Sequence, residues 1–240
     1  MKRILCFVPF LLVFRLCAQT EEPGHALVSV DKSSGVISNN TVSKNELLIP
    51  RKAFKELQHA QHDYASGNIR SSTRHLESAL RLYPNYLEAR NNLGAQYIEL
   101  HEYEKAIAEL QKAIQMSPSV VQPFNNLSVA FFLLKRYPDA ETAARQALVF
   151  DPQNSISRYV LGCTLATENR NIPEAVEMLR ASKNDFPESR LLLAKIAIRR
   201  GDVDEAKREL HDYLAVPGVE KRTAVERWLG QLGGASATRP

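Results

Sequence analysis

His59, His62 and Asp63 are the residues whose types and spacing come nearest to a chemical site in this sequence. Residues three positions apart lie on the same side of a helix, so both imidazoles would share one face beside a carboxylate. Such a set can bind zinc or iron. Position 59, however, belongs to a series that repeats every 34 residues, and its later members are leucine. We therefore favour an ordinary helix position for His59 and predict no metal site.

No other residues form a recognisable catalytic pattern. The sequence contains no glycine-rich phosphate loop, no nucleophile elbow and no pair of cysteines at the spacing of a zinc site. An enzyme needs polar groups with matched roles at one place. We therefore predict a protein that is not an enzyme and that has neither a cofactor nor a small-molecule substrate.

Composition and charge limit the kind of partner. The chain has 240 residues, of which 44% are hydrophobic and 24% charged, as in folded globular proteins. It carries 31 Lys and Arg against 27 Asp and Glu, or 28 against 27 once Lys2, Arg3 and Arg15 are set aside. Surfaces that bind nucleic acid carry a clear excess of positive charge, so we predict no nucleic-acid partner.

Those three cations belong to an N-terminal targeting signal. Lys2 and Arg3 precede an apolar run at Ile4–Phe14, and Ala18 offers a small residue for cleavage. This order is typical of a secretory signal peptide. We expect residues 1–18 to be removed and the protein to be exported to the periplasm or secreted. An uncleaved anchor is the alternative, but a membrane span needs about 20 apolar residues, so we expect no stable membrane insertion after cleavage.

Residues 19–49 show little periodicity, and we expect a mostly irregular leader there. Within it, His25–Val30 has the composition of a short strand. The pattern of the chain changes beyond this leader, where helical periodicity begins.

The rest of the chain repeats with a period of 34 residues. Within a period the apolar residues follow two helical patterns. Each period therefore predicts two helices packed as a hairpin, with a small residue where they approach closely and a proline that stops the second helix. The recurring positions are Ala79, Ala113 and Ala147; Pro84, Pro118 and Pro152; and Ala60, Gly94, Ser128 and Gly162.

The clearest period lies at residues 87–120. There, Asn92-Leu-Gly-x-x-Tyr97 is followed by Tyr103, Ala106, Ala113 and Pro118. This order resembles the tetratricopeptide repeat (TPR), and we interpret the chain as an exported TPR protein of bacterial type. The resemblance implies an all-α fold, an α-solenoid of about five helix-turn-helix units over residues 50–218. The expected units are about 53–86, 87–120, 121–154, 155–188 and 189–218, the last with a shortened first helix.

A repeat array needs a cap, because its last unit would otherwise expose an apolar face. Residues 219–232 predict a capping helix, since four apolar residues fall on one side of it. These residues are Val225, Trp228, Leu229 and Leu232. We expect residues 233–240 to form a disordered tail.

In TPR proteins the first helices of the units line a concave face that binds peptide segments. Asparagine there offers a donor and an acceptor to a peptide main chain, and aromatic rings anchor apolar side chains. The resemblance places on this face Asn91, Asn92, Asn125, Asn126, Phe132 and Tyr159. Two alternatives stay open: the asparagines bond a neighbouring helix, and the two aromatic residues belong to the core.

These observations predict a non-catalytic scaffold or adaptor that binds a peptide segment of a partner protein in the concave TPR groove. The alternative is a membrane-associated accessory factor for the assembly of an envelope, pilus or secretion complex. Recovery from the soluble exported fraction or from the membrane fraction separates the two.

Overall fold

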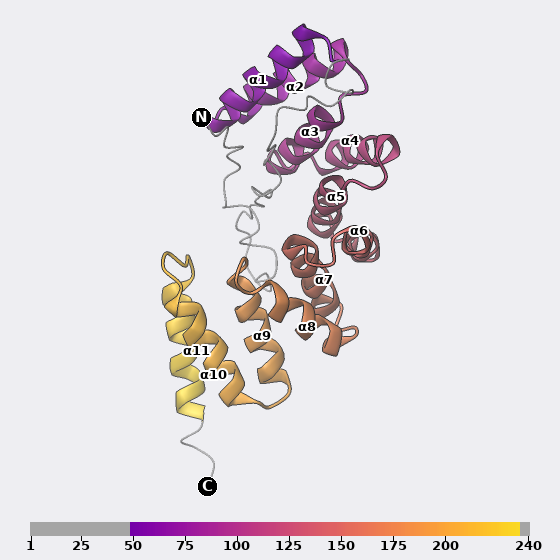
Figure 1. Cartoon of the computed structure of the whole chain (residues 1–240). Coiled ribbons are helices and arrows are strands. Elements are labelled where there is room, and N and C mark those ends of the chain that lie inside the picture. The colour runs from indigo at the N-terminus through magenta and orange to yellow at the C-terminus, as the bar shows by residue number, and fades with distance from the viewer. Residues whose placement is uncertain (1–48, 236–240) are drawn as a thin grey trace. The chain divides into compact units, whose positions relative to one another are not determined.

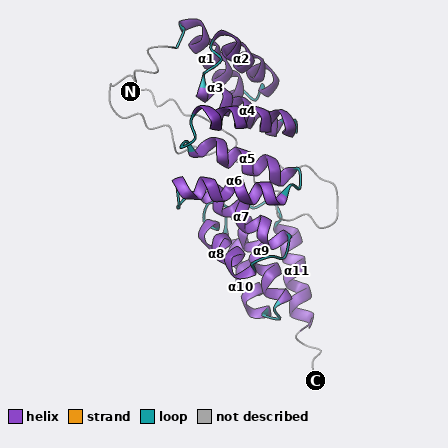
Figure 2. Cartoon of the chain, turned by 90° about the vertical axis from the view of Figure 1, so that its right-hand side faces the viewer, coloured by secondary structure: helices purple, strands orange, loops and turns teal. Residues whose placement is uncertain are grey.

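The structure is a computed structural model, and it describes residues 49–235. This range contains eleven helices and no strand (Figures 1 and 2), which confirms the predicted all-α repeat fold. Across the same range, no helix is both long enough and apolar enough to span a membrane. The expected signal peptide, the short strand of the leader and most of the expected tail lie outside the described residues.

The chain divides into two compact units that part after Pro152. In the first unit, three hairpins follow one another in chain order (Figure 1), and the two helices of each hairpin pack together. α3 also contacts α5, so the first helices of neighbouring hairpins lie side by side. The helices of this unit are α1 (Arg51–Ala65), α2 (Ile69–Leu82), α3 (Leu87–Glu99), α4 (Tyr103–Met116), α5 (Val121–Leu133) and α6 (Tyr137–Phe150).

The second unit contains two hairpins and a C-terminal helix. Its helices are α7 (Ser155–Thr167), α8 (Ile172–Ser182), α9 (Glu188–Arg199), α10 (Val203–Ala215) and α11 (Arg222–Ala235). α7 packs against α8 and α9, and α10 packs against α9 and α11. α9 has 12 residues and is shorter than the first helix of any other hairpin.

Small residues set the distance between the two helices of a hairpin. A Cβ atom built on Gly94 of α3 would lie 2.5 Å from Leu110 Cγ of α4, and one built on Gly162 of α7 would lie 2.8 Å from Leu179 Cγ of α8. Both leucines are fully buried, so a larger side chain at either glycine would have to displace close-packed core atoms. The predicted role of the small positions is confirmed at both glycines.

The turn inside each hairpin uses a residue in the left-handed region. The φ values are 79° at Gly67, 60° at His101, 59° at Lys135, 52° at Asn169 and 79° at Gly201. After each of these residues the next N–H donates back to a carbonyl in the last turn of the first helix, which caps that helix end. This turn was not predicted from the sequence, because non-glycine residues rarely adopt positive φ.

The C-terminal helix α11 covers the core of the second unit. Val225 is 3% exposed and joins a core cluster that includes Tyr213 of α10. Trp228, Leu229 and Leu232 pack against this cluster and stay partly buried. The four apolar residues of this helix therefore lie in or against the core of the second unit, and Trp228 is partly buried.

Candidate functional site

A hydrogen bond joins the asparagines of two neighbouring first helices. Asn126 Nδ2 of α5 donates to Asn91 Oδ1 of α3 over 3.0 Å. Asn126 is only 3% exposed, whereas Asn91 is half-buried. The alternative that an asparagine bonds the neighbouring helix is therefore realised at Asn126, whose side chain holds Asn91 in place.

The other two predicted asparagines differ in burial. Asn92 is half-buried, and its side chain has no hydrogen-bonding partner among the described residues. Asn125 is 3% exposed, and its main-chain carbonyl accepts a hydrogen bond from Ser128 Oγ at 2.7 Å. The sequence pattern treats these positions alike, but the structure leaves more surface at Asn92 than at Asn125.

The two predicted aromatic anchors lie in the core. Phe132 is 6% exposed and meets Tyr137 edge-on, with ring centroids 5.5 Å apart. Tyr159 is 0% exposed and stacks on Phe186 at 4.7 Å. Neither ring offers the exposed surface that we expected, because a neighbouring aromatic ring and the surrounding core cover it. Of the two alternatives left open by the sequence, the core position describes both rings.

The two histidines considered as metal ligands both lie on α1. His59 and His62 are exposed, and the His59 ring lies 5.3 Å from the ring of His75, which the sequence analysis had not considered. His75 Nδ1 lies 2.7 Å from a Glu56 carboxylate oxygen, and Nε2 lies 3.7 Å from one of Asp63. No group of three or more His, Cys, Asp or Glu side chains within residues 49–235 is arranged to hold a metal ion.

A buried polar network crosses the first two hairpins. Gln96 Nε2 of α3 donates to Ser72 Oγ of α2 over 2.7 Å, and Thr73 Oγ1 donates to Gln96 Oε1 over 3.2 Å. Ser72 Oγ in turn donates to the carbonyl of Ala60 in α1 over 2.6 Å. This network was not predicted from the sequence. One signal was the polar residue Gln96 between Ala95 and Tyr97 in a buried part of α3.

Glu99 ends the same helix with a second buried polar contact. It is 8% exposed, and the Tyr64 hydroxyl of α1 donates a hydrogen bond to its carboxylate. Burial raises the pKa of the Glu99 carboxyl to about 7, although the hydrogen bond from Tyr64 lowers it. The first unit therefore contains a carboxyl group that changes charge near neutral pH.

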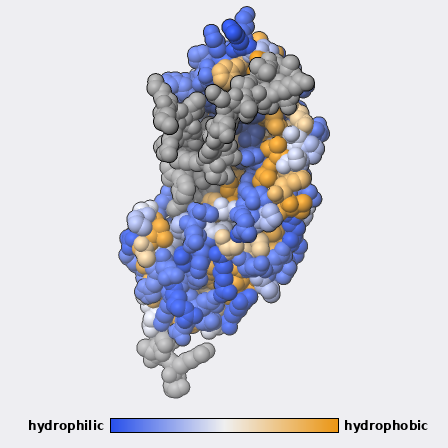
Figure 3. Space-filling model, in the orientation of Figure 1, coloured by the Kyte–Doolittle hydropathy of each residue, from blue (hydrophilic) through white to orange (hydrophobic). Residues whose placement is uncertain are grey.

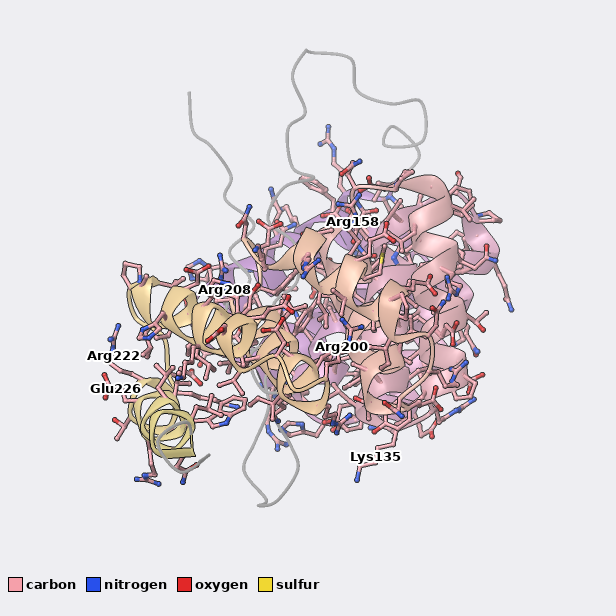
Figure 4. All side chains as sticks on the ribbon, turned by 90° about the horizontal axis from the view of Figure 1, so that it is seen from below. Lys135, Arg158, Arg200, Arg208, Arg222 and Glu226 are labelled. Atoms are coloured by element: carbon pink, nitrogen blue, oxygen red, sulfur yellow. The ribbon has the colours of Figure 1, made fainter. Side chains whose placement is uncertain are left out.

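Charged side chains of the second unit pair across its helices. Arg190 Nη1 of α9 lies 3.2 Å from Glu209 Oε2 and 2.8 Å from Asp212 Oδ2 of α10. On α11, Arg222 and Glu226 approach to 3.9 Å, and both are labelled in Figure 4. These cations form no ion pair with Glu188, the most deeply buried carboxylate that the structure describes in this unit.

Glu188 begins α9 and is 2% exposed. No other side chain donates a hydrogen bond to its carboxylate oxygens, and the Tyr159 hydroxyl has no hydrogen-bonding partner. A backbone hydrogen bond from Glu188 itself lowers the pKa of its carboxyl, and one from Lys221 lowers the pKa of Tyr213. Burial raises the pKa of the Glu188 carboxyl to about 7. No sequence signal pointed to this cluster, because its members come from three different helices.

Apolar residues also reach the surface of the first unit. Val149 and Phe150 at the end of α6 are 70% and 43% exposed, and Leu82 at the end of α2 is 44% exposed. Figure 3 shows apolar groups among polar ones on the face in view. A cavity of about 550 Å³ opens near the α2–α3 turn, between residues that include Tyr83 and Met116. None of the predicted site residues lines this cavity.

A sequence model of the tetratricopeptide repeat family matches residues 57–121 and 97–155. Together with the helical hairpins described above, this match shows that residues 57–155 contain tetratricopeptide repeats. No curated protein matches its sequence.

Solved TPR structures share the fold at low sequence identity. PilF of Pseudomonas aeruginosa has a TM-score of 0.64 at 18% identity, over 74% of this chain and 82% of that chain. MamA of Desulfovibrio magneticus has a TM-score of 0.61 at 17% identity, over 69% and 95%. A thermophilic TPR protein of Thermus thermophilus has a TM-score of 0.59 at 19% identity, over 75% and 98%. At these identities the similarity shows the fold alone.

Proposed function

We propose that this protein is a non-catalytic interaction scaffold that binds a peptide segment of a partner protein at Asn91 and Asn92. The observation that carries the proposal is the hydrogen bond from Asn126 to Asn91 Oδ1. This bond holds the Asn91 amide in place and leaves its two N–H donors without a partner among the described residues. The neighbouring Asn92 keeps both a donor and an acceptor, and a peptide main chain offers the matching carbonyl and N–H groups.

The roles of the other predicted residues change accordingly. Asn126 becomes a positioning residue for Asn91. Asn125, Phe132 and Tyr159 are too buried to meet a peptide directly, so they are left out of the proposed contact surface. The repeat fold supports a scaffold instead of an enzyme, because stacked helical hairpins present extended surfaces for binding.

A cross-linked pull-down with the tagged full-length protein tests this proposal. Asn92→Ala should lose the partner that the wild-type protein captures, because both groups that pair with the peptide are removed. Asn126→Ala should weaken capture, since Asn91 is no longer held. Asn184→Ala, a change at an exposed asparagine of the second unit, is the matched control and should retain the partner.

Helical content, measured by circular dichroism, must be equal in all variants for the comparison to be valid. Capture of the same partner by the wild-type protein, Asn92→Ala and Asn91→Ala would contradict the proposal. That result would place the partner on another surface of the protein.

We also propose that the protein is exported. The support is the order of charge, apolar run and small residue over residues 1–18. Mass spectrometry of the protein from its native cells should find an N-terminus at Gln19 in the soluble exported fraction. Intact residues 1–18 in the membrane fraction would instead favour the membrane-associated accessory factor for assembly of an envelope complex.

A further inference from the structure

The cavity beside the α2–α3 turn lies one helical turn from the proposed peptide contact. Its volume is about 550 Å³, within the range of about 300–1,000 Å³ that is usual for ligand pockets. Glu88 lines the cavity, and Asn91 and Asn92 follow Glu88 by three and four residues on α3. Residues at these spacings share one face of a helix, with Cβ atoms about 5–6 Å apart. A peptide bound at the two asparagines therefore has the cavity beside it.

Aromatic and apolar side chains form one part of the cavity wall. The rings of Tyr83 and Tyr86 meet at an angle of 60°, with centroids 5.9 Å apart. Met116 at the end of α4 and Ile49 before α1 also line the cavity. Tyr86 is buried, whereas Tyr83 and Met116 are half-buried. The cavity thus offers apolar surface to a partner, and the faces of tyrosine rings also attract cations.

The charge on the cavity wall is negative. Of the described residues that line the cavity, only Glu88 is charged, and it is exposed. Gln61 Nε2 of α1 donates to Glu88 Oε1 over 3.1 Å. A carboxylate accepts up to about four hydrogen bonds, so this bond is compatible with a bound cation. Arg90, the cation of α3, is already engaged, because it donates to Glu109 and to the Pro84 carbonyl.

We propose that this cavity binds an arginine side chain of the partner segment whose main chain contacts Asn91 and Asn92. The identity of the partner rests on the proposed scaffold function, whereas the chemistry of the cavity is independent of it. In the complex the apolar stem of the arginine packs against Tyr83 and Met116, and its guanidinium group donates to the Glu88 carboxylate.

Arginine fits the cavity better than the other candidates. Its stem is apolar, and its charged planar head stacks on aromatic rings and can form two parallel hydrogen bonds with a carboxylate. Lysine would supply the charge without the planar group. A leucine or phenylalanine side chain would fill the apolar part of the cavity but would gain nothing from Glu88. An acidic side chain or a phosphate group would be repelled by Glu88.

The test uses the full-length protein and butylguanidinium chloride, which reproduces an arginine side chain and has no peptide group. The methionine methyl groups are labelled with carbon-13, and their NMR signals are followed during a titration at constant ionic strength. The signal of Met116 should shift, whereas that of Met178 on α8 of the second unit should not. Butylurea has nearly the same shape and no charge, so it should bind about twofold to fivefold more weakly, the range for an exposed ion pair.

Three variants separate the contributions of charge and ring. Glu88→Gln should raise the Kd of butylguanidinium about twofold to fivefold and leave that of butylurea unchanged. Tyr83→Leu should raise the Kd of butylguanidinium by a similar factor of about two to five, because the cation loses an aromatic face. Glu104→Gln changes an exposed carboxylate in the first turn of α4. It is the matched control and should leave both Kd values unchanged.

Equal Kd values for butylguanidinium and butylurea, or for the wild-type protein and Glu88→Gln, would overturn the proposal. The absence of any Met116 response in the wild-type protein would do the same. A response that emerges only in Lys44→Ala would also overturn it. Lys44 is the last cation before Ile49 in the chain, and the cavity would then bind this residue of the chain itself.

The pull-down links the cavity to the proposed function. Glu88→Gln should weaken capture of the partner, whereas Glu104→Gln should retain it. Loss of the partner in Asn92→Ala with full capture by Glu88→Gln would reject the arginine site and retain the peptide contact. A charge-dependent response of Met116 with full capture by Asn92→Ala would reject the peptide contact and retain the cavity as a cation site. The two failures are therefore distinguishable.

Discussion

The stability of the second unit should depend on the protonation of Glu188, and Glu188→Gln measures this dependence. The side chain is 2% exposed, and no other side chain donates a hydrogen bond to its carboxylate oxygens. Placing a charge there is unfavourable because burial removes its hydration. Burial thereby raises the pKa of the carboxyl from 4.5 to about 7.

The sign of the pH dependence follows from these two values. Below pH 4.5 the carboxyl is protonated in both the folded and the unfolded state, so no stability is lost. Between pH 4.5 and about 7 the unfolded chain releases its proton more readily, and the free energy of unfolding falls as the pH rises. The full loss persists above this range. At about 1.4 kcal/mol for each pH unit, it amounts to about 3 kcal/mol.

Urea unfolding at pH 4.5 and pH 8.5, followed by Trp228 fluorescence, measures the effect in the second unit. Glutamine does not ionise, so Glu188→Gln should gain up to about 3 kcal/mol relative to the wild-type protein between the two pH values. Any cost of the amide that does not depend on pH cancels in this difference. Glu99 cancels as well, because it titrates in both proteins.

Glu177→Gln is the control, because its carboxylate is exposed on α8. It should change stability equally at both pH values. If the difference between Glu188→Gln and the wild-type protein stays constant within about 0.5 kcal/mol across the range, the carboxyl is not an unpaired buried group. The reasoning about the buried Glu188 carboxyl would then be refuted.

Three further changes test other parts of the structure. Gly94→Val should lower the free energy of unfolding, measured with urea, by about 1–3 kcal/mol, because the valine Cβ would lie 2.5 Å from Leu110 Cγ. Unchanged stability would contradict the close approach of α3 and α4. Gly201→Ala should lower the free energy of unfolding by about 1 kcal/mol, because φ is 79° at this position. Crowding does not contribute, since no atom lies within 4 Å of the added Cβ. A stabilised variant would rule out the left-handed turn. Tyr64→Phe should raise the pKa of Glu99 above its value of about 7, because it removes a hydrogen bond that lowers this pKa. Carbon-13 NMR of the Glu99 carboxyl measures the change, and a lower pKa in the variant would contradict the prediction.

The hairpins could be predicted from the sequence because residues of the same type recur at the same position in several periods. Gly94 and Gly162 occupy the same position two periods apart, and each faces a buried leucine of the second helix. A single glycine would not have indicated how the helices pack, but two glycines at the same position of the repeat made the close approach of the two helices predictable. The turn residues did not follow this logic, since Gly67 is replaced by His101 and Lys135 in the same left-handed position. Backbone hydrogen bonds of the turn, which any residue type can make, set that conformation.

The candidate site was only partly predictable, for a different reason. Asn92 and Asn126 hold the same place in successive units, yet one is half-buried and the other is 3% exposed and bonded to Asn91. Exposure depends on what the neighbouring hairpin places against a side chain, and one unit's own pattern does not contain that information. Tyr159 is covered by Phe186, which stacks on its ring from the segment between α8 and α9.

The sequence by itself determined the all-α repeat, the small residues at which the two helices of a hairpin approach closely, and the apolar face of α11. These features depend on spacing along one or two helices, and spacing can be read directly. Only the tertiary structure decided which polar groups lose contact with water. Glu188, Tyr159 and Tyr213 come from three different helices and are all buried, so the cost of burying the carboxylate arises from the packing of the helices and from no property of the residue alone.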